Sequence, residues 1–110
     1  MNVNDKKIVI FITASSKEEA ENIGKALVNE RFAACCNIVD NISSIFRWEG
    51  KICRENEVLL IVKSSSDLFN DIVNKVKALH SYKVPEIIAV PLIYGSEEYL
   101  NWIENEIVTT

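Results

Sequence analysis

Two uninterrupted apolar runs, Ile8–Ile12 and Val58–Val62, constrain the fold of this chain more than any other feature of its sequence. Both are far shorter than the roughly 20 residues of a membrane-spanning helix, and the longest nearly apolar stretch, Ile87–Tyr94, is interrupted by Pro91. A half-solvated antiparallel strand alternates between polar and apolar residues, whereas a strand covered on both faces does not. We therefore expect two central β-strands in a protein that does not cross a membrane.

The rest of the pattern alternates strands with amphipathic helices. Ser16 and Glu19 form a capping box, and the apolar residues that follow at helical spacing predict a helix to about Arg31. The pattern of residues 33–48 and 51–63 is typical of β-strands, and Glu49-Gly50 between them is typical of a turn. Together these segments predict a long hairpin. By residue range, the expected elements are a strand at 6–14, a helix at 16–31, hairpin strands at 33–48 and 51–63, a helix at 68–80, a strand at 86–94, and a final helix with Tyr99, Leu100, Ile103 and Ile107 facing inward.

This order of elements, β-α-β-β-α-β with a terminal helix, predicts an α+β protein with the ferredoxin-like plan. The strands at 6–14 and 51–63 are then central, and the strand that contains Pro91 lies at an edge or carries a bulge. Both crossover helices lie on one face, so a second copy of the chain is the simplest cover for the other face. A strand of about 15 residues spans about 50 Å, so the hairpin must bend sharply or pair with a neighbour. We expect an oligomer; the alternative is a bulged hairpin in a monomer.

Length and composition exclude several classes of function. The 110 residues leave room for one domain, with a core from about residue 6 to residue 107. A net charge of −4, with basic residues scattered among acidic ones, argues against nucleic acid as the main partner. Three dispersed glycines exclude a phosphate-binding loop, and a single histidine excludes a multi-histidine zinc site. No nucleophile with a base and an orienting group is visible, so we expect no enzyme and no obligatory cofactor.

The three cysteines indicate a reduced, cytoplasmic location, because a bridge between the adjacent Cys35 and Cys36 would be strained. In a strand these two side chains point to opposite faces, so at most one of them serves a site. Burial as a small hydrophobe is the commoner use of a free cysteine. Lys63 ends an apolar strand and is either a ligand-facing cation or a lysine that reaches solvent.

His80 and Glu86 are the candidate metal ligands, since the short connection between them sets an imidazole near a carboxylate. Two ligands make a weak site that needs water or a neighbouring subunit, and a helix-capping histidine is the alternative. Aromatic residues near the element ends suit subunit contacts better than a cofactor cage, and we assign Trp48, Tyr82, Tyr94, Tyr99 and Trp102 to this class. The acidic residues Glu18, Glu19 and Glu21 are expected on a solvated helix face.

Four segments resemble the CutA family of divalent-cation tolerance proteins. They are Ala33–Ile38 (AACCNI), Phe46–Ile52 (FRWEGKI), His80–Ile87 (HSYKVPEI) and Tyr99–Trp102 (YLNW). The resemblance runs from about Ile8 to Ile107 and implies a ferredoxin-like subunit in a homotrimer similar to the PII signalling proteins. It implies a trimer interface that includes Phe46, Trp48, Ile52 and Trp102.

The resemblance also implies a function in tolerance to copper and other divalent ions. The metal ligands proposed in the family correspond to Ile12, His80 and Glu86 here; Ile12 cannot bind a metal, which leaves His80 and Glu86 as weak ligands for Cu²⁺ or Zn²⁺ at clefts between subunits. Cys35, Lys63 and Tyr82 are expected to line that cleft. The sequence therefore favours a non-enzymatic, metal-binding homotrimer, with a PII-like signalling or partner-binding trimer that senses a small ligand as the alternative.

Overall fold

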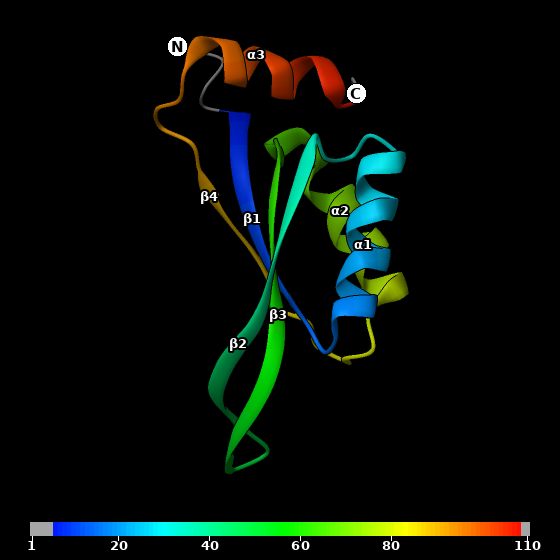
Figure 1. The fold of residues 1–110 in the computed structure, drawn as a ribbon, viewed down its shortest axis with the longest axis vertical. Helices are drawn as coiled ribbons and strands as arrows, with labels where there is room; N and C mark the ends of the chain where they lie inside the picture. The colour runs from blue at the N-terminus through cyan, green and yellow to red at the C-terminus, as the bar shows by residue number, and fades with distance from the viewer. Residues whose placement is uncertain (1–5, 109–110) are drawn as a thin grey trace.

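The computed structural model describes residues 6–108, which form one four-stranded antiparallel sheet and three α-helices (Figure 1). The strand order β2-β3-β1-β4 confirms the ferredoxin-like plan, with the two apolar strands in the centre and the proline-containing strand at an edge. The elements in chain order are β1 (Lys7–Ala14), α1 (Lys17–Asn29), β2 (Cys35–Trp48), β3 (Lys51–Ser65), the 3₁₀ helix η2 (Ser66–Leu68), α2 (Phe69–Leu79), β4 (Ile87–Pro91) and α3 (Glu97–Glu106).

The core lies between the sheet and the helices α1 and α2, which cover the same face (Figure 1). Ile12 of β1 pairs with Leu60 of β3, and both are fully buried under Ile23 of α1 and Ile72 of α2. Burial of each such side chain contributes about 1.5–3 kcal/mol, so this layer is the main source of stability. None of the helices within residues 6–108 has the length and apolar character needed to cross a bilayer.

Arg31 connects the end of α1 to the end of α3. It adopts a left-handed backbone conformation, with φ 62°, directly after the helix. Its guanidinium donates from Nε to the carbonyl of Glu106 at 3.0 Å and from Nη2 to the carbonyl of Asn105 at 2.8 Å. Its own carbonyl accepts from the amide of Val108 at 2.7 Å. One side chain therefore satisfies carbonyls that the end of α3 leaves without helical partners.

The β2–β3 hairpin extends well beyond the helices and gives the molecule its long axis of 44 Å (Figure 1). The pairing register shifts between Val39 and Ile42, where Asn41 has a φ of 67°. A bulge of this kind bends and twists a strand. That the hairpin bends sharply or pairs with a neighbour stays a prediction. The tip turns through Glu49 and Gly50, whose φ angles are both positive at 50° and 79°.

Two expectations about the C-terminal third of the chain are wrong. The last strand ends at Pro91 rather than Tyr94, which is 89% exposed. The amide of Leu92 still donates to the carbonyl of Lys7 at 2.9 Å, but Lys7 is the first residue of β1. The edge strand therefore ends where its partner begins. Tyr99 does not face inward but is 42% exposed on α3.

The other face of the sheet carries apolar side chains that α1 and α2 do not cover. Phe11 pairs with Ile61 on one side and with Ile88 on the other, and the three point away from the core face of Ile10 and Ile12. Ile88 is 54% exposed. This is the open face for which the sequence predicts a cover.

Candidate functional site

A groove of about 770 Å³ opens between the hairpin and the connection that joins α2 to β4. Its floor comes from Thr13 near the end of β1 and from Cys53, Glu55 and Glu57 of β3. The lining residues are Thr13, Ser44, Ile45, Phe46, Trp48, Cys53, Glu55, Glu57, Ser81, Tyr82, Lys83, Val84 and Glu86. Most residues that the sequence singles out for metal binding or subunit contact thus lie in or beside one groove.

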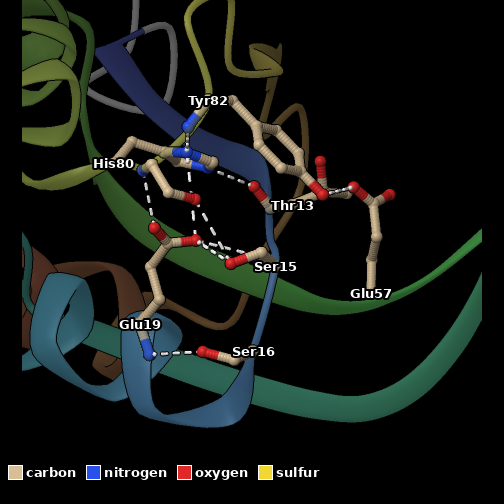
Figure 2. A network of polar contacts seen from close by, with 8 residues as sticks. Thr13, Ser15, Ser16, Glu19, Glu57, His80 and Tyr82 are labelled. Atoms are coloured by element: carbon tan, nitrogen blue, oxygen red, sulfur yellow. Dashed lines mark hydrogen bonds and ion pairs between the residues drawn. The ribbon is translucent and has the colours of Figure 1, made fainter.

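His80 holds the start of the connection, and both of its ring nitrogens form hydrogen bonds (Figure 2). The amide of Tyr82 donates to Nδ1 at 3.0 Å, so Nδ1 is an acceptor and Nε2 carries the proton, which it donates to the carbonyl of Thr13 at 2.6 Å. The ring is fully buried and packs 4.9 Å from the ring of Tyr82. His80 therefore acts in this chain as a neutral cap that fixes the start of the connection.

Glu19 holds the same connection from the side of α1. Its Oε2 accepts from the amide of Ser81 at 2.6 Å, and its Oε1 accepts from the amide and the hydroxyl of Ser15 at 2.8 and 2.9 Å (Figure 2). Partial burial acts to raise the pKa of Glu19, but the hydrogen bonds from Ser15 and Ser81 outweigh it and lower the pKa below the ordinary 4.5. The assignment of Glu19 to a solvated helix face is therefore wrong. The capping box with Ser16 was the available signal, since it places this carboxylate at the helix start.

Tyr82 and Glu57 form the wall of the groove. The phenol of Tyr82 donates to Oε2 of Glu57 at 2.8 Å, and Glu57 is only 6% exposed. Burial and the carboxylate of Glu57, with a smaller contribution from Glu55, raise the pKa of Tyr82. The phenol therefore remains a neutral donor at physiological pH. Sequence reasoning missed Glu57, because its partner lies 25 residues further along the chain, in the connection between α2 and β4.

The two candidate metal ligands differ in their surroundings. Glu86 is exposed and lines the groove, whereas His80 lies beneath the lining with both nitrogens occupied. Across residues 6–108, no hydrogen bond or ion pair joins the two side chains, and no three His, Cys, Asp or Glu residues gather in a group that could hold a metal ion. Ile12 is fully buried in the core. Residues 6–108 of a single chain therefore do not fit a complete metal site.

Cys35 and Lys63 lie together at the other end of the sheet. Lys63 Nζ is 3.9 Å from Cys35 Sγ and donates to Oδ1 of Asn37. Burial and the neighbouring Cys35 raise the pKa of Tyr99, which reaches this cluster from α3. Of the three residues expected to line a cleft, the structure brings Cys35 and Lys63 together, while Tyr82 lies in the groove, next to Glu57 of β3.

Cys36 points to the opposite face from Cys35, as predicted. Its Sγ approaches Gly24 of α1 so closely that a Cβ at that position would lie 3.1 Å away. Burial, with a contribution from Cys35, raises the pKa of the Cys36 thiol to about 11. Cys36 is therefore a packed, protonated thiol and not a ligand.

The four residues predicted for the trimer interface are exposed in the single chain, whereas Tyr82, also assigned to subunit contacts, is half-buried in the groove wall. Phe46, Trp48 and Ile52 lie near the hairpin tip, and Trp102 lies on α3, where its ring packs 5.5 Å from that of Tyr99. Ile52 is 73% exposed. Large apolar side chains gathered at two ends of one molecule are typical of a surface that meets another chain.

Residues 8–106 match the family model described as CutA1 divalent ion tolerance protein. The chain is 50% identical over 95 residues to the divalent-cation tolerance protein CutA of Thermus thermophilus, which covers 86% of this chain and 92% of that protein. It is 41% identical over 98 residues to the chloroplastic CutA protein of Arabidopsis thaliana, and this match covers 89% of the chain but 54% of the plant protein.

Solved structures give the same result. The fold superposes on the divalent cation tolerance protein CutA1 of Thermus thermophilus with a TM-score of 0.91 and 46% identity, covering 93% of this chain and 99% of that one. It superposes on CutA1 of Oryza sativa with a TM-score of 0.93 and 38% identity, covering 96% of each chain. The match thus holds over nearly the whole sequence and includes the hairpin and the groove. The chain belongs to the CutA1 divalent ion tolerance protein family.

Proposed function

We propose that this protein acts in divalent-cation tolerance as a non-enzymatic homotrimer that binds Cu²⁺ or Zn²⁺ weakly at clefts between its subunits. The observation that carries the proposal is the position of Glu86, an exposed carboxylate at the groove, on the connection that begins at His80. Residues 6–108 of one chain offer these two ligands, so a neighbouring subunit or water must complete the site. A divalent ion held by so few protein ligands binds weakly.

The contacts of His80 add a cost to metal binding. A metal ion on Nδ1 must displace the amide of Tyr82, and one on Nε2 must displace the carbonyl of Thr13. Each displaced group loses a buried hydrogen bond, which costs about 1–3 kcal/mol. Metal binding would therefore also shift the connection that lines the groove, which couples the ion to the shape of the cleft.

The open face of the sheet and the exposed hairpin residues support the trimer. Ile88 of the face and Ile52 of the hairpin are each more than half exposed. Covering such side chains with another chain gains about 25 cal/mol for each Å² of apolar surface removed from water. The free thiols of Cys35, Cys36 and Cys53 support a reducing location, and we place the protein in the cytoplasm.

Calorimetric titration with Cu²⁺ and Zn²⁺ tests the metal site. We expect a saturable heat with the wild type and a much smaller heat with the His80→Ala, Glu86→Ala double variant. Glu86→Gln alone is the safer variant, because Glu86 is exposed and its loss does not threaten the fold. Glu106→Gln, on the exposed side of α3, is the matched control. Equal heats for the wild type and Glu86→Gln would remove Glu86 from the site.

The size of the groove favours a second function, a PII-like signalling or partner-binding trimer that senses a small molecule. A volume of about 770 Å³ lies within the range of pockets that hold organic ligands and is far larger than a metal ion needs. A ligand that binds only the folded state raises the melting temperature. A metabolite panel screened by thermal unfolding tests this function, and a panel without any stabilising compound would contradict it.

A further inference from the structure

Glu57 is a buried carboxylate that forms no ion pair with a cationic side chain among residues 6–108. It is 6% exposed, and the phenol of Tyr82 donates to its Oε2 at 2.8 Å. Among the ion pairs of residues 6–108, none includes Glu57. Buried charges in proteins are usually paired, because removing a carboxylate from water costs several kcal/mol that a neutral phenol offsets only in part. A bound cation would therefore stabilise the carboxylate of Glu57.

The other charged residues that line the groove are mainly acidic. Glu55 and Glu86 line it with Glu57, and Lys83 is the one basic residue of the lining. The carboxylates of Glu57 and Glu55 both act on Tyr82, so these charges share one part of the groove. Three carboxylates against one ammonium give a negative potential that attracts cations into a concave site.

The aromatic rings of the lining indicate the kind of cation. Phe46 and Trp48 enter from the hairpin, and Tyr82 enters from the connection. Aromatic faces attract alkylammonium groups and pack well against methylene chains. A bare metal ion needs neither, and no group of three potential ligands gathers within residues 6–108. Acidic groups, aromatic walls and a volume of about 770 Å³ together suit an organic cation.

The geometry points to a binding site for aliphatic diamines in this groove. One ammonium pairs with Glu57, the methylene chain lies along Phe46, Trp48 and Tyr82, and the second ammonium lies near Glu86. This inference gives a ligand class to the small-molecule function proposed above and rests on the same groove. It does not depend on metal binding. Phe46 and Trp48 are also expected at the subunit boundary, so an assembled trimer would place a neighbour beside the chain of the ligand.

Calorimetric titration with 1,5-diaminopentane, in the presence of a metal chelator, tests the site. Glu57→Gln is the informative variant, because its amide oxygen still accepts from the phenol of Tyr82 while the charge is removed. We expect saturable binding to the wild type and at least about tenfold weaker binding to Glu57→Gln, since a charge-assisted hydrogen bond is lost. Glu106→Gln changes the net charge equally at a distant surface and should bind as the wild type does.

A neutral ligand of the same length separates charge from packing. We expect 1,5-pentanediol to bind at least about tenfold more weakly than the diamine, because it cannot neutralise Glu57. Equal affinity of the wild type and Glu57→Gln for the diamine, or equal affinity of the wild type for the diol and the diamine, would overturn the inference. A folded wild type that is stabilised by another metabolite but not by the diamine would overturn it too, and would leave the small-molecule function standing.

Discussion

Glu19 shows how one side chain fixes segments that are far apart in sequence. Its carboxylate accepts from Ser15 at the end of β1 and from Ser81 at the start of the groove connection, while its own amide donates to the capping hydroxyl of Ser16. Hydrogen bonds to a carboxylate stabilise its charged form. The connection that lines the groove is therefore held by a group that titrates.

The Glu19→Gln variant should flatten the acid end of the stability profile. The folded-state pKa of Glu19 is lowered, so the carboxylate stabilises the fold above its ordinary pKa of 4.5, and this contribution is lost as the pH falls through the lower folded value. We expect Glu19→Gln to lose about 1–3 kcal/mol at pH 7 and to approach the wild type in strong acid. Urea unfolding between neutral and acidic pH measures this. The exposed neighbour Glu18, changed to Gln, is the control, and parallel pH profiles for the wild type and Glu19→Gln would contradict the prediction.

At the scale of elements, the hairpin tip carries a conformational cost. Glu49 and Gly50 both have positive φ angles, as in a two-residue turn of type I′. Glycine adopts this conformation without strain, whereas in glutamate the close approach of Cβ to the backbone raises the energy of the folded state.

Glu49→Asn should therefore stabilise the protein. Asparagine tolerates the left-handed region, and Asn-Gly is the preferred sequence of this turn. We expect a gain of up to about 1 kcal/mol in the free energy of unfolding, measured by chemical denaturation. Gly50→Ala is the opposing control and should destabilise, because its φ of 79° is strained for any residue with a Cβ. A loss of stability in Glu49→Asn would show that the glutamate makes contacts outside this turn.

The sequence predicts most elements because their signals are local. The capping residues and apolar spacing of α1 and α2, and the Glu49-Gly50 turn, lie within a few residues of the structure they determine. The end of β4 was missed because it depends on where β1 begins, which no local pattern records. Tyr99 was misplaced for a different reason. It is adjacent to the buried Leu100, and neighbouring helical residues diverge by about 100°.

The site was only partly predictable. The importance of the segment from His80 to Glu86 follows from its residue types, but the contacts of His80 with Thr13 and of Tyr82 with Glu57 join residues far apart in the chain. Such pairs follow from the strand order and register, which composition and spacing determine only coarsely.

At the scale of the whole molecule, the open sheet face should control assembly. Ile88→Glu places a charge on that face, on the edge strand β4, and Ile88 is exposed enough that the single chain can still fold. We expect the wild type to sediment as a trimer and Ile88→Glu as 12.5 kDa monomers. Val28→Glu also replaces an exposed apolar side chain by a carboxylate, but on the outer side of α1, and it should leave the trimer intact. A wild type that sediments at 12.5 kDa would exclude the trimer and its clefts.

The pairing of β1 has a consequence for synthesis of the chain. The strand is translated early, but one partner, β3, pairs with it as far along as Ser65, and the other, β4, reaches Pro91. Until those residues leave the ribosome, the apolar segment of β1 lacks its pairing partners on both edges, and such segments are prone to aggregate. The nascent protein should therefore engage chaperones for most of its elongation and acquire resistance to protease only when translation is nearly finished.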